Sequence, residues 1–182
     1  YQACDGTLGT PYILASWASI PCPQPLLHKE VSPDSLVCAG DVLTYRISWS
    51  NGGGVTITNL TITDTLPASV AYRAPSLDVW AMPDGLGTPA LASAYAATTA
   101  GPWTAGEPAD GTPGPLALRW TVNRVAPFGP SGGLAYQVRL APGLSLGTTV
   151  YNVASATQSG DSAVYATETT MVFASAISLT KT

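Results

Sequence analysis

The chain has 182 residues and a formal net charge of −4, and only 10% of its residues are charged, whereas an ordinary soluble domain carries about 25%. The seven Lys and Arg residues are scattered singly, so there is no basic stripe for nucleic acid or for an anionic membrane surface. Hydrophobic residues make up 46%. The surface is therefore either covered by small polar residues or buried against other copies of the chain.

No apolar run is long enough for a transmembrane helix. The sequence opens at Tyr1 without a basic region followed by an apolar run. We expect a mature, secreted chain located outside the cell or on its surface, and a trimmed boundary is the alternative.

The disulfide candidates are Cys4, Cys22 and Cys38. Cysteines gathered in a Thr-rich β protein predict one disulfide in an oxidising compartment, with one thiol left over. The sequence does not decide which two pair. His28 is the only histidine and no C-x-x-C spacing occurs, so we expect no metal site and no cofactor.

Residues 1–25 form an N-terminal extension. Within it, the segment PYILASWASI is apolar enough for one strand, and CPQP then breaks it. The residues that would carry this strand are Tyr12, Ile13, Leu14, Ala15, Trp17 and Ile20.

A regular strand pattern begins at residue 26. The clearest segment is VLTYRISWS, which alternates strictly between two faces and so predicts a half-buried strand. In VTITNLTITDTL the apolar phase slips around Asn59, which predicts a β-bulge there. The expected strands in this half are 26–31, 42–50, 55–66 and 70–74.

Residues 75–117 are dense in Ala, Gly, Pro, Ser and Thr. So long a connection is unusual in a compact sandwich. We interpret it as an insertion with one or two short strands, such as 77–82. The alternative is a subunit contact region that carries Trp80, Tyr95 and Trp103.

Alternation returns after the insertion, and no segment has a helical period. The expected strands are 116–125, 133–141, 147–159 and an extended segment over 162–182. Many short strands separated by turn residues predict an all-β Greek-key sandwich with extended terminal strands.

Several of these segments resemble the DUF11, or conserved-repeat, domain of prokaryotic surface proteins. The segments that match the family motifs are LLHKEVSPD (26–34), GDVLTYRISWSN (40–51), TNLTITDTLP (58–67), LRWTV (118–122) and YNVASAT (151–157). The resemblance spans residues 26–173, interrupted by the insertion. It implies an immunoglobulin-like sandwich outside a prokaryotic cell, and it implies no catalytic residues because the family is a structural spacer.

The residues themselves also indicate no enzyme, since no base stands beside a nucleophile in any recognisable pattern. We expect His28 to face solvent on the first strand. Asp64 lies in the DTLP segment, where we expect it to accept backbone hydrogen bonds in a turn. A calcium site using Asp64 or Asp41 is the alternative. Asn59-Leu60-Thr61 is a possible glycosylation sequon.

The C-terminal segment reads like the first strand of a following repeat, although residues 26–31 already supply one. We predict that it is an inter-subunit strand, which adds to the sheet edge of the next copy and builds a filament. Its residues are Ala174, Ser175, Ala176, Ile177, Ser178, Leu179, Thr180, Lys181 and Thr182. The alternatives are an extension of this domain's own last strand, a linker, or donation by the strand over Tyr12–Ile20 instead.

These observations predict a structural subunit of an extracellular, pilus-like filament whose partners are copies of itself. A stalk module of a larger adhesin or surface-layer protein is the first alternative. Carbohydrate binding by Trp80 and Trp103 is the second, and it is disfavoured because Trp residues in such a segment are more often packing anchors.

Overall fold

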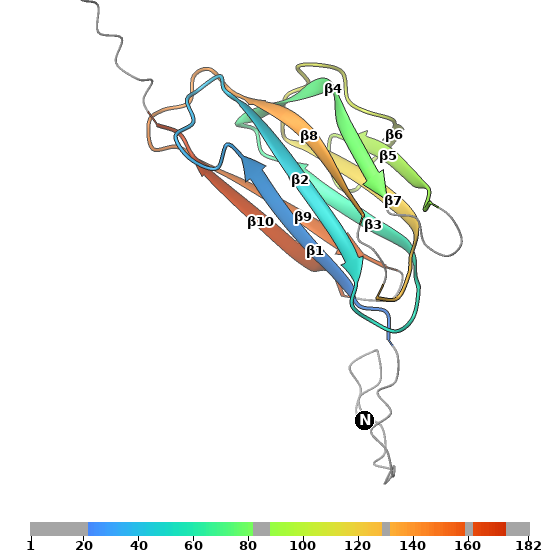
Figure 1. Ribbon diagram of the computed structural model, residues 1–182. Coiled ribbons are helices and arrows are strands. Elements are labelled where there is room, and N and C mark those ends of the chain that lie inside the picture. Colours follow the sequence, from blue (N-terminus) through green and yellow to red (C-terminus); the bar gives the residue numbers. More distant parts are fainter. Residues whose placement is uncertain (1–21, 82–87, 129–131, 159–161, 174–182) are drawn as a thin grey trace, which may run out of the picture.

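Figure 1 shows the computed structural model of the chain, in which residues 22–81, 88–128, 132–158 and 162–173 are described. These residues form two antiparallel β-sheets packed face to face. The predicted all-β sandwich is therefore confirmed, and the described residues contain no helix.

Ten strands make up the two layers, and each layer mixes strands from both halves of the chain. The four-stranded sheet has the order β1 (Pro25–Ser32), β2 (Val42–Asn51), β8 (Gly132–Leu140) and β4 (Val70–Ala81). The six-stranded sheet has the order β10 (Val164–Met171), β9 (Thr149–Thr157), β3 (Ile57–Leu66), β7 (Leu116–Val125), β5 (Leu91–Ala96) and β6 (Thr104–Ala105).

The core lies between the two sheets, where alternate residues of each strand point inward. In β2 the predicted inner face is confirmed, with Leu43, Tyr45, Ile47 and Trp49 buried. At the centre stands Tyr136 of β8. Its ring centroid lies 5.6 Å from that of Tyr45, 6.0 Å from that of Tyr72 and 5.7 Å from that of Trp120, at spacings typical of favourable aromatic pairs.

The predicted phase slip at Asn59 is present, but its cause differs from the expected bulge. Asn59 has φ of 53°, in the left-handed region that Asn tolerates. Thr58 pairs with Arg124 and Leu60 with Val122, so the register is the same on both sides of Asn59. No extra residue is inserted in one strand. Both strands change phase together, as the burial of Val122 and Val125 on β7 shows.

The segment between β4 and β7 widens one sheet and covers the edge of the other. The strand predicted at 77–82 is instead the second half of β4, joined to the first half through a shift in register between Arg73 and Asp78. β5 and β6 extend the six-stranded sheet beyond β7. The following loop runs along β4, where the Tyr72 N–H donates to the Thr112 carbonyl and the Gly111 N–H to the Tyr72 carbonyl, both at 2.8 Å.

The described chain begins and ends at opposite ends of the sandwich. Residues 22–24 precede β1 at one end, and Phe173 follows β10 at the other (Figure 1). There the Phe173 N–H donates to the Val37 carbonyl at 2.7 Å. The predicted strand over 162–182 is therefore β10 followed by a short contact within the same chain, and residues 174–182 lie outside the described residues.

At Gly114 the inserted loop packs tightly against the start of β4. Its N–H donates to the Val70 carbonyl at 2.8 Å, and a Cβ at this position would lie 2.0 Å from the Pro67 carbonyl oxygen. We expect Gly114→Ala to displace the loop and to lower the free energy of unfolding by about 1–3 kcal/mol, the usual cost of overpacking. Gly143→Ala is the matched control, because a Cβ at Gly143 meets nothing within 4 Å. Urea denaturation measures both variants, and equal stabilities would contradict the expected contact.

Candidate functional site

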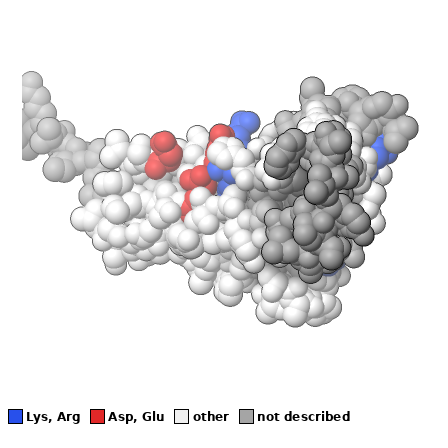
Figure 2. All heavy atoms as spheres, turned by 90° about the horizontal axis from the view of Figure 1, so that it is seen from below, with Lys and Arg blue, Asp and Glu red and all other residues white. Residues whose placement is uncertain are grey.

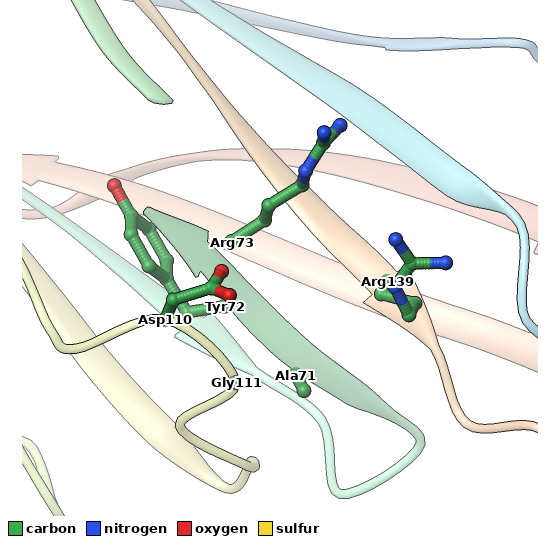
Figure 3. A pocket seen from close by; sticks show the side chains of 6 residues that line it. All are labelled: Ala71, Tyr72, Arg73, Asp110, Gly111 and Arg139. Carbon is green, nitrogen blue, oxygen red and sulfur yellow. The ribbon is translucent and has the colours of Figure 1, made fainter. Parts of the chain in front are cut away.

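The described residues show little sign of a small-molecule site. A shallow pocket of about 80 Å³ lies beside β4 and is lined by Ala71, Tyr72, Arg73, Asp110, Gly111 and Arg139 (Figure 3). It is well below the few hundred Å³ of a typical ligand site. No group of His, Cys, Asp and Glu in the described part of the chain could hold a metal ion, and no helix there could span a membrane.

Most of the inter-subunit residues predicted from sequence lie outside the described residues. This holds for Ala174–Thr182, for Tyr12–Ile20 and for Cys4. Cys38 is a half-buried free thiol. Its backbone N–H donates to Asp41 Oδ2 at 2.7 Å, so Asp41 holds a turn, and calcium binding at Asp41 stays an alternative prediction. Asn59 is exposed, and its glycosylation stays a prediction.

Of the two predicted tryptophans, one lies in a strand and the other in a loop. Trp80 belongs to β4. Trp103 precedes β6, and the guanidinium carbon of Arg119 lies 4.1 Å from its ring centroid. A cation over the ring face stabilises the aromatic side chain by a cation–π interaction. Arg119 therefore packs on the ring of Trp103, and carbohydrate binding by the two tryptophans stays an alternative prediction.

Two long strand edges lie side by side on one flank of the sandwich. β1 is the last strand of the four-stranded sheet and β10 the last strand of the six-stranded sheet, and the two strands are in contact. Among the described residues, backbone pairing across this flank occurs only beyond the ends of the two strands, at the isolated bridge between Val37 and Val172. Along β1 and β10 themselves, the N–H and C=O groups of the outer edge have no backbone partner within the described part of the chain.

The two edges differ in the side chains that flank them. The solvent face of β1 carries His28 and Glu30, which form an exposed pair at 3.0 Å, and His28 thus faces solvent as expected. The solvent face of β10 carries Tyr165, Thr167, Thr169 and Met171, all exposed and none charged. Charged residues are a usual protection of strand edges against pairing with other chains, and this face of β10 lacks them.

The surface as a whole is sparsely charged. In the view of Figure 2, acidic and basic side chains occupy only a few small groups, and the rest of the visible described surface is uncharged. Several large apolar side chains are also exposed. Leu36, Leu146 and Phe173 lie near the end where β10 finishes, with exposed fractions of 76%, 69% and 39%.

The most unusual site in the molecule is a buried polar cluster between the sheets. Lys29 of β1 forms an ion pair with Asp64 Oδ2 of β3, and both side chains are fully buried. The Tyr136 hydroxyl of β8 donates to the same carboxylate oxygen at 2.5 Å. Asn152 Nδ2 of β9 donates to the Tyr136 hydroxyl at 3.2 Å. The cluster therefore joins two strands of each sheet.

Burial dominates the electrostatics of this cluster. It lowers the pKa of the Lys29 amine, although the nearby Asp64 carboxylate acts in the opposite direction. Burial, followed by the charge of Asp64, raises the pKa of Tyr136 well above its ordinary value. Tyr45 packs against the amine, with its ring centroid 4.8 Å from Lys29 Nζ. The buried amine thus lies against the Tyr45 ring and contacts the Asp64 carboxylate.

The sequence-based role of Asp64 was wrong. It does not accept backbone hydrogen bonds in a turn but points into the core from the middle of a strand. Sequence reasoning also missed Tyr136 and Asn152 and treated Lys29 only as part of a family motif. The available signal was strand alternation, which places Lys29 on the face of Val31, Asp64 on that of Ile62, and Asn152 on that of Val150 and Ala154.

Comparison with known proteins identifies the type of fold but no protein family. No protein-family profile matches the chain, and no curated protein sequence matches it. Among solved structures, the major pilin subunit BcpA of Bacillus cereus, as its D312A variant, is 12% identical with a TM-score of 0.50 over 82% of this chain. The pilus backbone RrgB of Streptococcus pneumoniae is 14% identical with a TM-score of 0.42 over 74% of this chain.

The match to BcpA shows the type of sandwich and nothing finer. The chain spans 40% of the length of BcpA and 31% of the length of RrgB. A third solved structure, AvmM, which catalyses macrocyclization in alchivemycin A biosynthesis, is 10% identical with a TM-score of 0.39. The chain therefore has the immunoglobulin-like sandwich fold seen in pilin domains, while its function rests on its own features.

Tyr136 is the hydrogen-bonding centre of the buried cluster. Tyr136→Phe keeps the ring but removes the donor to Asp64 and the acceptor for Asn152. We expect this change to lower the free energy of unfolding by about 1–3 kcal/mol, the cost of leaving buried polar groups unpaired. Tyr151→Phe is the matched control, because Tyr151 is 57% exposed and should lose almost nothing. Urea denaturation of both variants decides, and a loss in the control equal to that in Tyr136→Phe would refute the role of the cluster.

Proposed function

We propose that this chain is a structural subunit of an extracellular prokaryotic filament that polymerises head-to-tail by β-strand donation. The observation that carries the proposal is the long edge of β10, which is unpaired along most of its length within the described residues and lacks charged side chains on its exposed face. A strand from a second copy can pair with such an edge through backbone hydrogen bonds.

The other edges are poorer acceptors. The first half of β4 already pairs with the loop at 111–114, and the Ser76 N–H donates to Glu107 Oε2 at 3.2 Å. β6 has only two residues. β1 is long enough, but its solvent face carries charges. By elimination, β10 is the edge that supports addition of a strand.

The proposed donor is the segment 174–182, which follows directly after Phe173. Phe173 stands at the end of the sandwich opposite to residues 22–24 (Figure 1), and we propose that the segment following it pairs with a neighbouring copy at this end. In the added strand, Ile177 and Leu179 would supply the apolar contacts. The segment Tyr12–Ile20, which precedes the opposite end, is the second choice.

Other parts of the proposal rest on the sequence. The likeness to DUF11 domains supports a location outside the cell and a mechanical rather than an enzymatic role, with no cofactor. The free thiol of Cys38 leaves Cys4 and Cys22 as the proposed disulfide, which would anchor the N-terminal extension to the start of β1. Partners are copies of the chain, and neither nucleic acid nor carbohydrate is proposed.

Deletion of residues 174–182 tests the donor. We expect the shortened chain to fold, because no described core residue is lost, and to remain monomeric under conditions in which the full chain forms filaments. Size-exclusion chromatography and electron microscopy measure the outcome. Deletion of residues 1–21 is the comparison for the second-choice donor. Normal filaments from the chain without 174–182 would refute this donor.

A substitution on the edge strand tests the acceptor. Thr169→Lys places a charge on the exposed face of β10, and we expect it to reduce filament formation at least tenfold without unfolding the domain, since about 1.4 kcal/mol corresponds to a factor of ten. Thr65→Lys is the control, because Thr65 is also exposed but lies on β3 in the interior of the sheet. Equal assembly of the two variants, followed by light scattering, would exclude β10 as acceptor.

The first and last described residues lie at opposite ends of the sandwich (Figure 1), which also suits a stalk module joined in tandem to other domains. The two functions differ in the mass of the native polypeptide. A native chain close to 18.6 kDa fits a subunit, whereas a much longer native polypeptide fits a stalk module of an adhesin or surface-layer protein.

A further inference from the structure

We propose that Lys29 and Asn152 become joined by an intramolecular isopeptide bond, with Asp64 as the acid–base group of the reaction. The proposal rests on the geometry of the buried cluster and holds whether or not the chain forms filaments.

The three side chains converge from three strands. Lys29 of β1 contacts Asp64 of β3 directly. Asp64 faces Ala154 across the β3–β9 pair, so Asn152 is its diagonal neighbour on the same inner face, and side chains in that relation are within reach of long residues. β1 and β9 are themselves in contact. The amine, the carboxylate and the carboxamide therefore share one closed space.

Four buried side-chain oxygen atoms of the described residues lack a hydrogen-bond partner. Two of them, Asp64 Oδ1 and Asn152 Oδ1, belong to the reacting groups, and a third is the hydroxyl of Tyr45, whose ring packs against Lys29. Buried polar atoms are nearly always hydrogen-bonded, and an exception calls for an explanation, which can be a reaction. An amide formed between Lys29 and Asn152 would present a new N–H donor beside the Asp64 carboxylate. The bonded state thus supplies a partner for a group that lacks one in the unbonded state.

The surroundings favour the reactive form of the amine. Burial lowers the pKa of Lys29, and transfer of its proton to Asp64 in this apolar space turns an ion pair into a neutral amine and a carboxylic acid. A desolvated neutral lysine is a competent nucleophile. In this cluster, the tyrosine and tryptophan rings around Tyr136 provide the apolar surroundings.

The reaction balances without a cofactor. The lone pair of Lys29 Nζ attacks Asn152 Cγ and forms the new C–N bond, while Asp64 protonates the carboxamide oxygen. Asp64 then relays a proton from Nζ to Nδ2. As the Cγ–Nδ2 bond breaks and ammonia leaves, the C=O double bond re-forms and its oxygen returns the proton to Asp64. The products are one secondary amide and one ammonia molecule, with no change in oxidation state, and Asp64 regains its starting form.

Asn152 rather than Asp64 is the acceptor because of where the proton donors lie. If Asp64 were attacked, its leaving oxygen would need another acid, and its remaining contact is the Tyr136 hydroxyl, whose raised pKa makes it a poor donor. Glu168 lies opposite Asn152 in the register of β9 and β10 and is only partly buried. With Asn152 as acceptor, Asp64 contacts the amine and is linked to the carboxamide through Tyr136.

The bond would change how the domain carries tension. Residue 29 lies near the start of the described chain and residue 152 near its end. A covalent link between them would transmit a pulling force from the first strand to the penultimate one and bypass residues 30–151. The core strands would then stay folded under a load that unfolds a domain held by hydrogen bonds alone.

Mass spectrometry of the reduced, full-length chain tests the bond. We expect an intact mass lower than that of the sequence by one ammonia molecule, together with a branched proteolytic peptide that joins residues 29 and 152. An unchanged mass would overturn the proposal. A loss of one water with a Lys29–Asp64 link would overturn the choice of acceptor. Ammonia lost as a succinimide at Asn51-Gly52 would leave only linear peptides, and it too would refute the bond.

Variants separate the chemistry from the packing. Lys29→Met, Asp64→Asn and Asn152→Ala should each restore the full mass, whereas Lys181→Met, which changes the chain's other lysine, should keep the loss of ammonia. Circular dichroism checks that each variant folds. If the core variants fail to fold, the branched peptide of the natural chain decides the question. A folded Asp64→Asn variant that still loses ammonia with a Lys29–Asn152 link would overturn the role of Asp64.

Discussion

The buried contact between Lys29 and Asp64 fixes how the two sheets lie on one another. Taking a lysine and a carboxylate out of water costs several kcal/mol for each ion, and only a close pair with further hydrogen bonds offsets that cost. Here the partners come from different sheets, β1 and β3, and Tyr136 and Asn152 extend the contact to β8 and β9. A slide of one sheet over the other by about one residue would separate the two charges and leave each of them buried without a partner. The apolar core tolerates rearrangement far better than this cluster does.

The strands of the sandwich could be predicted from the sequence because alternation is a local property. Alternation alone shows which side chains face inward in VLTYRISWSN and LALRWTVNRV, and both segments form the expected strands. The same rule places Lys29, Asp64 and Asn152 on inner faces. What it cannot state is that three strands far apart in the chain meet at one point, since that depends on sheet order. The resemblance of the DTLP segment to the family motif also led to the prediction that Asp64 holds the turn at Pro67, whereas its side chain is buried in the core.

The inserted segment shows where local signals fail. Residues 75–117 have the composition of a loop, yet they supply the second half of β4, two further strands and a cover for the β4 edge. Their pairing is specified by backbone hydrogen bonds, which leave no trace in side-chain periodicity, and by single groups such as Glu107, whose carboxylate accepts from the Tyr72 hydroxyl at 2.9 Å. The strand at 77–82 was recognisable, but its continuity with 70–74 was hidden by the shift in register at Arg73. At Asn59 the sequence predicted a bulge that is not there. A change of phase in one strand looks like a bulge until the partner strand is known to change phase with it, as β7 does here.

The insertion and the buried cluster have complementary effects on the edges of the sandwich. One flank is closed, because the loop at 106–114 binds along β4 and leaves it little capacity to pair with another chain. The other flank holds β1 and β10, and the strands that bear Lys29 and Asn152 are β1 itself and the neighbour of β10. An exposed edge is a risk for a domain that can fray, because fraying offers still more unpaired backbone to other chains. Anchoring β1 and β9 through a buried pair, or through a bond between them, keeps this flank rigid, so that the proposed pairing of a partner strand with the β10 edge does not require the domain to fray.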